Sequence, residues 1–230
     1  VNNDYGKGFD DALTAAFKKD GGTVAANVAH EDGKAEYRAE LGQLASTGVQ
    51  NLVILAYANG SGQTILRQAV ESGDFSKYVG GDGMVADALF TGIDKKAVEG
   101  MIATKAGESA TAGTPMYEKA AKDAGLKADA VYAPQSYDAA FALALAIEKN
   151  GSAKREGLSK ALRAVTSGSG EPIYPGEWKK AVELIKAGKD INYEGASGSL
   201  DFDENGDVPG TIVEMKAEDG KFVLVGPAKP

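Results

Sequence analysis

Short apolar runs of strand length alternate with helix-length segments in the first half of the chain, and glycine-rich turns separate them. Residues 52–56 form a continuous apolar run, typical of a parallel strand that is covered on both faces. A glycine-rich turn at 59–62 and a helical pattern through residues 65–69 follow it, and the strand-like Tyr78-Val79 then leads into the turn at 80–83. This alternation predicts a right-handed parallel α/β sheet flanked by helices.

The first segment of the chain has the apolar spacing of an amphipathic helix over residues 5–19. Asp4 is its expected N-cap, and Gly21-Gly22 is its expected stop. Alternation of apolar side chains at residues 24–28 predicts a short strand directly afterwards.

The second half of the chain is richer in helical patterns than in strands. We expect helices near residues 139–147, 155–165 and 177–187. Short strands are expected at 199–202, 211–216 and 222–225, with turn sequences at 203–207 and 218–220 that favour hairpins.

Composition excludes several classes of function. The formal charge of −8 argues against a nucleic-acid partner, and no apolar stretch reaches the roughly 18 residues that membrane insertion requires. The sequence has no cysteine and a single histidine, His30, which we expect to be an exposed loop residue. Nucleophile–base pairs and zinc sites therefore lack their usual side chains, and we expect no enzymatic activity, cofactor or metal.

Two glycine-containing motifs offer alternative hypotheses. Residues 81–86 fit a loose dinucleotide fingerprint, which would make the protein a nucleotide-using enzyme, but Asp82 within the turn would repel phosphate. Residues 201–207 resemble the start of a calcium loop, although its twelfth position is Ile212 where a bidentate Glu is needed. A β-turn is the better interpretation of the second motif.

Two tyrosines and an acid fall at junctions between expected elements. Tyr5 lies at the start of the first helix, while Tyr57 and Asp82 directly follow two expected strands. Ligands of open α/β sheets bind at the carboxyl ends of the strands. We therefore expect these three side chains to form a site for a small, partly apolar ligand that carries a cation, although each also fits an ordinary surface or turn position.

Several motifs, in this order and spacing, resemble the solute-binding proteins of ABC transporters for branched-chain and related amino acids, of the type I periplasmic-binding fold. The resemblance covers essentially the whole chain and rests on residues 4–8, 66–69, 80–83, 136–140 and 193–207.

The resemblance implies a two-lobed protein with a hinge, of which this chain lacks the amino-terminal part, so that the first lobe is incomplete. Residues 1–128 would form the second lobe, residues 129–207 the carboxyl-terminal part of the first lobe, and residues 208–230 strands that return to the second lobe.

The resemblance also implies a function and a set of ligand-binding residues. A periplasmic, or extracellular and lipid-anchored, protein would capture an amino acid between its lobes and deliver it to a permease and an ATPase of an ABC transporter. Tyr5 would line the cleft, Asp82 would accept a hydrogen bond from the ligand ammonium, Tyr57 would be a second cleft tyrosine, and Tyr132 would border the side-chain pocket. A ligand-sensing domain of a receptor or regulator on the same fold is the alternative.

Overall fold

The computed structural model of the protein describes residues 1–107 and 109–228. The chain divides into two compact units: unit 1 contains Val1–Lys105 and Ile212–Pro230, and unit 2 contains Ala106–Thr211. The chain therefore passes between the units twice. The predicted lobe boundaries after residues 128 and 207 remain a prediction.

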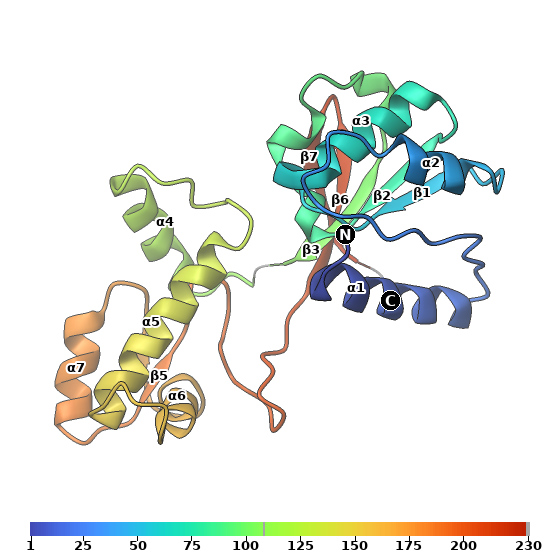
Figure 1. Cartoon of the computed structure of the whole chain (residues 1–230). Coiled ribbons are helices and arrows are strands. Elements are labelled where there is room, and N and C mark those ends of the chain that lie inside the picture. The colour runs from blue at the N-terminus through green and yellow to red at the C-terminus, as the bar shows by residue number, and fades with distance from the viewer. Residues whose placement is uncertain (108, 229–230) are drawn as a thin grey trace. The chain divides into compact units, whose positions relative to one another are not determined.

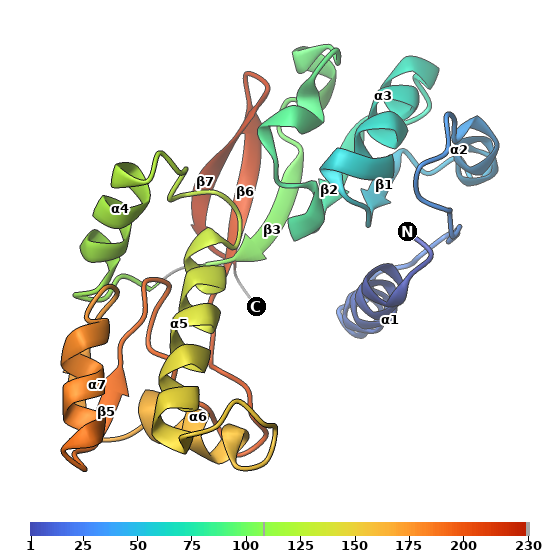
Figure 2. The same cartoon turned by 60° about the vertical axis from the view of Figure 1, so that its left-hand side comes forward.

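Unit 1 combines a sheet with α-helices and several short helical turns (Figures 1 and 2). Its strands are β1 (Asn51–Ile54), β2 (Lys77–Gly80), β3 (Ile102–Ala106), β6 (Ile212–Glu218) and β7 (Lys221–Pro227). Its α-helices are α1 (Asp4–Lys19), α2 (Arg38–Ala45) and α3 (Gln63–Ser72). Short helical turns lie at η1 (Ala58–Gly62), η2 (Asp82–Met84), η3 (Asp87–Phe90) and η4 (Lys95–Val98).

The sheet of unit 1 has the strand order β1-β2-β3-β6-β7. The pairs β1–β2 and β2–β3 are parallel, and α3 is the helix of the crossover that parallel pairing of β1 and β2 requires. β6 and β7 form an antiparallel hairpin, with φ angles of 49° at Asp219 and 75° at Gly220 in its turn. The predicted parallel α/β sheet and the predicted hairpin at 218–220 are both confirmed.

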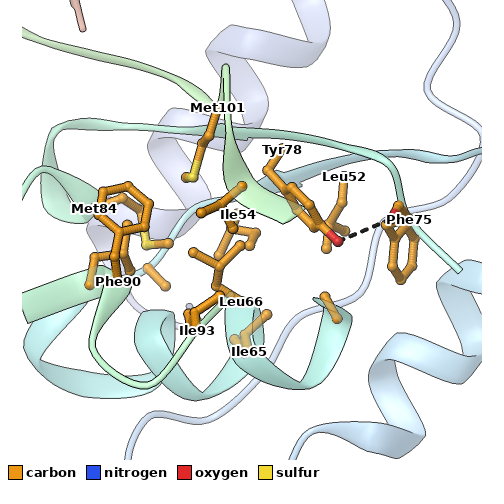
Figure 3. Packing of buried hydrophobic residues seen from close by; sticks show 14 of the residues in the cluster. Leu52, Ile54, Ile65, Leu66, Phe75, Tyr78, Met84, Phe90, Ile93 and Met101 are labelled. Atoms are coloured by element: carbon orange, nitrogen blue, oxygen red, sulfur yellow. Dashed lines mark hydrogen bonds between the residues drawn. The ribbon is translucent and has the colours of Figure 1, made fainter. Parts of the chain in front are cut away.

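The main core of unit 1 lies between the sheet and α3 (Figure 3). Leu52 and Ile54 of β1 face Leu66 of α3, which is fully buried. Burial of each such side chain stabilises the fold by about 1.5–3 kcal/mol. Tyr78 of β2 is buried beside them, and its hydroxyl donates a hydrogen bond to the carbonyl oxygen of Phe75 at 3.0 Å, so this polar atom is satisfied inside the core.

The other face of the same strands is not covered, so the prediction that residues 52–56 form a strand buried on both faces is wrong. Side chains alternate along a strand, and here Val53 is 44% exposed and Val79 is 36% exposed, whereas their strand neighbours are buried. A continuous apolar run does not reveal which of its alternating side chains meets a helix.

Unit 2 packs its helices around a small parallel sheet. In chain order it contains α4 (Thr114–Asp123), α5 (Ala133–Asn150), α6 (Leu158–Thr166), β4 (Glu171–Ile173), α7 (Trp178–Lys186) and β5 (Ile191–Tyr193). β4 and β5 pair in parallel. Leu145 of α5, Val165 of α6 and Tyr193 of β5 are fully buried in its core, and the Tyr193 ring stacks on Phe141 at 4.9 Å between centroids.

Two predicted strands are wrong for a common reason. Residues 23–30 and 200–203 run without regular secondary structure, and Ser199 makes only an isolated bridge to Glu194. An alternating or apolar pattern becomes a strand only where the backbone of a neighbouring strand pairs with it. The predicted hairpin at 203–207 is consequently also wrong.

Candidate functional site

Unit 1 brings three of the four predicted site residues together. Tyr5 lies in the first turn of α1, Tyr57 follows β1 and precedes η1, and Asp82 begins η2 after β2. The Tyr5 hydroxyl donates a hydrogen bond to Asp82 Oδ1 at 3.0 Å, and the Tyr5 and Tyr57 rings stack with centroids 5.1 Å apart. The cluster therefore lies at the carboxyl ends of two parallel strands, the edge that open α/β sheets use for ligands.

Tyr5 is held on several sides. The backbone N–H of Gly83 donates to its hydroxyl oxygen at 3.3 Å, and the Phe9 ring meets the Tyr5 ring edge to face. Burial, followed by the neighbouring Asp82 carboxylate, raises the pKa of Tyr5 to about 12. The hydroxyl therefore keeps its proton at neutral pH and acts as a hydrogen-bond donor to the carboxylate.

Asn3 is a site residue that the sequence analysis missed. Its side-chain oxygen accepts a hydrogen bond from the Gly6 N–H at 2.9 Å, so Asn3, not the predicted Asp4, is the N-cap of α1. Its amide Nδ2 donates to the Tyr57 hydroxyl at 3.4 Å. Asn is a favoured capping residue, so the sequence already carried a capping signal at Asn3, one position before the predicted N-cap Asp4.

The glycines that flank Asp82 allow the helix and the turn to approach each other. A Cβ atom at Gly81 would lie 2.3 Å from the Phe9 ring, and one at Gly83 would lie 2.6 Å from the Ala56 carbonyl oxygen. Both distances are too short for nonbonded carbon contacts. These glycines are therefore required by close packing around Tyr5.

Tyr132 belongs to unit 2, where it immediately precedes α5. Its backbone is left-handed, with φ of 62°, and its side chain is 41% exposed. A non-glycine residue with positive φ is uncommon and often lies at a functional position. Its predicted part in ligand binding remains a prediction.

His30 is partly buried and bonded, so the expectation of an exposed loop histidine is wrong. Its Nε2 lies 2.9 Å from the Ser61 hydroxyl oxygen, and its ring packs edge to face on Tyr37. Asp32 Oδ1 accepts from the Ser61 N–H at 2.6 Å, and hydrogen bonding by Ser61 lowers the pKa of Asp32. These contacts tie residues 30–32 to the turn that follows Tyr57.

The loop at 201–207 uses its acidic side chain for its own backbone. Asp203 Oδ1 accepts hydrogen bonds from the N–H groups of Asn205, Gly206 and Asp207, each at 2.9 Å. A carboxylate oxygen engaged in this way organises an Asx-type turn. Within residues 1–107 and 109–228, no group of three or more His, Asp or Glu side chains is placed to hold a metal ion.

The dinucleotide hypothesis lacks its structural context. The turn at Gly81–Gly83 leads into η2, which is a three-residue 3-10 turn. The fingerprint needs the N-terminus of an α-helix at this position, because its aligned N–H groups bind the pyrophosphate.

A cavity of about 920 Å³ lies elsewhere in unit 1. It is open to solvent on one side and is lined by α1, residues 23–30, α2 and the exposed face of β1 and β2, and its walls are chiefly apolar. Tyr5, Tyr57 and Asp82 are not among its lining residues. The volume of this cavity and the polar groups around Asp82 thus indicate different candidate binding sites. We favour the cluster of Tyr5, Tyr57 and Asp82, because a charged ligand needs the polar partners that converge there.

The family model described as "Receptor family ligand binding region" matches residues 1–217. The chain belongs to this family. Membership agrees with the resemblance inferred from the sequence motifs.

Solved structures show the same fold. The leucine binding protein LivK from Thermotoga maritima superposes with a TM-score of 0.75 at 26% identity, over 100% of this chain and 59% of that one. The branched-chain amino acid transporter substrate binding protein LivJ from Streptococcus pneumoniae, in complex with isoleucine, gives 0.70 at 18% identity, over 99% of this chain and 57% of that one. The chain therefore has the type I periplasmic-binding fold and spans somewhat more than half the length of these structures.

A curated relative has a different cellular context. The chemotactic signal transduction system substrate-binding protein BasB from Halobacterium salinarum is 30% identical over 123 residues, which are 54% of this chain and 29% of that protein.

In the part of this chain that the structure describes, none of the helices has the length and apolarity needed to cross a bilayer.

Proposed function

We propose that the protein binds an amino acid, branched-chain or related, and that Tyr5, Tyr57 and Asp82 form the wall that receives the ligand's ammonium group. The Tyr5–Asp82 hydrogen bond at the carboxyl ends of β1 and β2 carries this proposal. The similarity to a leucine binding protein at 26% identity supports the class of ligand.

The chemistry of the wall suits an ammonium group with an apolar neighbour. The protonated Tyr5 hydroxyl orients the Asp82 carboxylate, and a hydrogen bond between a carboxylate and a charged donor contributes about 1.5–3 kcal/mol. The stacked tyrosine rings add apolar surface and a negative ring face that attracts cations. We assign Tyr132 of unit 2 to the border of the ligand's side-chain pocket.

For the complete protein we propose an extracytoplasmic location and delivery of the amino acid to the permease of an ABC transporter. The relatives named for transport of branched-chain amino acids support this proposal. The match to BasB, a substrate-binding protein of a chemotaxis system, favours ligand sensing as a second candidate. Uptake of labelled amino acid by cells with and without the gene separates the two, because a sensor would leave uptake unchanged.

Calorimetry tests the proposed binding wall. L-leucine, L-isoleucine and L-valine are titrated to millimolar concentration into the complete protein, its Asp82→Asn variant and the control variant Asp74→Asn, which changes an exposed acid of unit 1. We expect Asp82→Asn to weaken binding roughly ten- to hundredfold at an unchanged melting temperature. Equal affinities in all three proteins would refute the wall, and an absence of binding to any amino acid would refute the function.

A further inference from the structure

Asp138 is a buried acid that the proposed binding wall does not use. It lies in the second turn of α5 and is 1% exposed. Its Oδ1 accepts from the Tyr193 hydroxyl at 2.7 Å and from the Ala196 N–H at 2.8 Å. Its Oδ2 accepts from the N–H and the hydroxyl of Ser197 at 2.8 and 2.7 Å. Hydrogen bonds from these four donors offset the cost of removing the carboxylate from water. The same bonds fix residues 193–197 on α5.

The loop at residues 195–197 also holds the segment by which the chain enters unit 2. The Ser109 N–H donates to the Ser197 carbonyl oxygen at 2.9 Å. The Thr111 and Thr114 hydroxyls donate to the carbonyl oxygens of Gly195 and Ala196 at 2.5 and 3.0 Å. The N–H groups of Ala196 and Ser197 therefore point toward Asp138, whereas the carbonyl oxygens of residues 195–197 accept hydrogen bonds from residues 109–114.

The segment by which the chain leaves unit 2 starts from this loop as well. Residues 199–211 continue directly from it, and at their far end the Thr211 carbonyl oxygen accepts from the Gly107 N–H at 2.8 Å. The two connections are thus joined to each other near the crossings and to α5 through residues 195–197.

Glycine permits the close approach at the centre of this arrangement. A Cβ atom at Gly195 would lie 2.4 Å from Asp138 Oδ2, and one at Gly113 would lie 3.0 Å from the Glu194 carbonyl oxygen. The carboxylate contacts the loop backbone directly, with no space for a larger residue.

We propose that Asp138 is a positioning residue that, through the loop 195–197, holds the entering and leaving chain connections of unit 2 on α5. This inference needs no ligand, so it stands or falls independently of the binding wall.

A carboxylate is required because every group around it is a donor. Asparagine has the same shape but replaces one oxygen with an NH₂ group. In Asp138→Asn that group would face either the Ala196 or the Ser197 N–H, and one of these two backbone donors would lose its acceptor.

Hydrogen–deuterium exchange of the full chain, without ligand, tests the proposal. In Asp138→Asn we expect amides in residues 109–114 and 195–199 to exchange about ten- to hundredfold faster, while α6 of unit 2 and α3 of unit 1 keep their wild-type rates. The matched control is Tyr193→Phe, which removes one donor to Asp138 but leaves both loop N–H bonds. It should lower the melting temperature and leave residues 109–114 at their wild-type exchange rate.

Two results would overturn the proposal. One is wild-type exchange of residues 109–114 in Asp138→Asn, and the other is the same exchange pattern in Asp138→Asn and Tyr193→Phe, which would make Asp138 a support of β5 only. If Asp138→Asn does not fold, Ser197→Ala replaces it. Unlike Tyr193→Phe, this substitution removes a bond between Asp138 and the loop itself, at the residue whose carbonyl oxygen accepts from the Ser109 N–H, and it should accelerate exchange of residues 109–114 several-fold.

A double-mutant cycle distinguishes transmission through residues 195–197 from a purely local effect of each substitution. Thr111 does not bond to Asp138 but to the Gly195 carbonyl oxygen. If Asp138 acts on residues 109–114 through the loop, the exchange effects of Ser197→Ala and Thr111→Val should be non-additive. Additive effects would contradict transmission through residues 195–197.

Discussion

At the scale of single residues, Tyr5 links the electrostatics of the candidate site to a measurable titration. Burial and the neighbouring Asp82 carboxylate raise its pKa to about 12, so the folded protein keeps the proton above the pH at which a free tyrosine, with a pKa of about 10, loses it. Between these two values the unfolded chain binds fewer protons than the folded one. The contribution of Tyr5 to stability is therefore complete below pH 10 and declines as the pH rises toward 12.

We expect the ultraviolet titration of the wild type minus that of Tyr5→Phe to show one tyrosine that ionises near pH 12. In denaturant unfolding, the wild type should lose stability more steeply than Tyr5→Phe between pH 10 and pH 12. A difference curve centred near pH 10 would show that the hydroxyl is not packed against Asp82.

At the scale of elements, the loop at 201–207 shows how a motif can share the composition of a cation site without its geometry. Asp203 Oδ1 already serves three backbone N–H groups. Backbone hydrogen bonds, that from Asp207 first, lower the pKa of Asp203, so this turn is weakened when the pH falls and the carboxylate is protonated.

We therefore expect millimolar calcium, or its removal by chelator, to leave the melting temperature of the protein unchanged, because a bound ion would raise it. Asp203→Asn keeps an acceptor oxygen and should leave the loop folded, whereas Asp203→Ala should increase proteolysis within residues 201–207. A melting temperature several degrees higher with calcium would restore the calcium hypothesis.

At the scale of the whole molecule, each unit has its own buried core. Leu66 is fully buried in unit 1, and Leu145 is fully buried in unit 2. Truncation of a buried leucine to alanine costs about 2–5 kcal/mol. Leu66→Ala should accelerate amide exchange in β1, β2 and α3, and Leu145→Ala should accelerate it in α5, α6 and β5. Equal acceleration throughout the chain by either substitution would show that the two cores unfold as one.

The candidate site was accessible from the sequence because junctions between elements are marked by local chemistry. Tyr57 directly follows the apolar run at residues 52–56, Asp82 follows the strand-like Tyr78-Val79 after two glycines, and the glycines beside Asp82 mark a close backbone approach. Strand order, in contrast, brings β1 next to β2, and only this pairing makes the two junctions neighbours. Their use for a ligand remains a prediction.

The sequence by itself determined the α/β class, the positions of most helices and the family, because helical periodicity, apolar runs and ordered motifs are local properties of a chain. Only the tertiary structure decided which face of β1 is buried, that residues 24–28 do not pair as a strand, and that Asp138 gathers four donors from residues 193–197. The reason is that a strand's partner, the covered face of a sheet and the donors around a buried carboxylate come from segments distant in sequence. No local pattern records them.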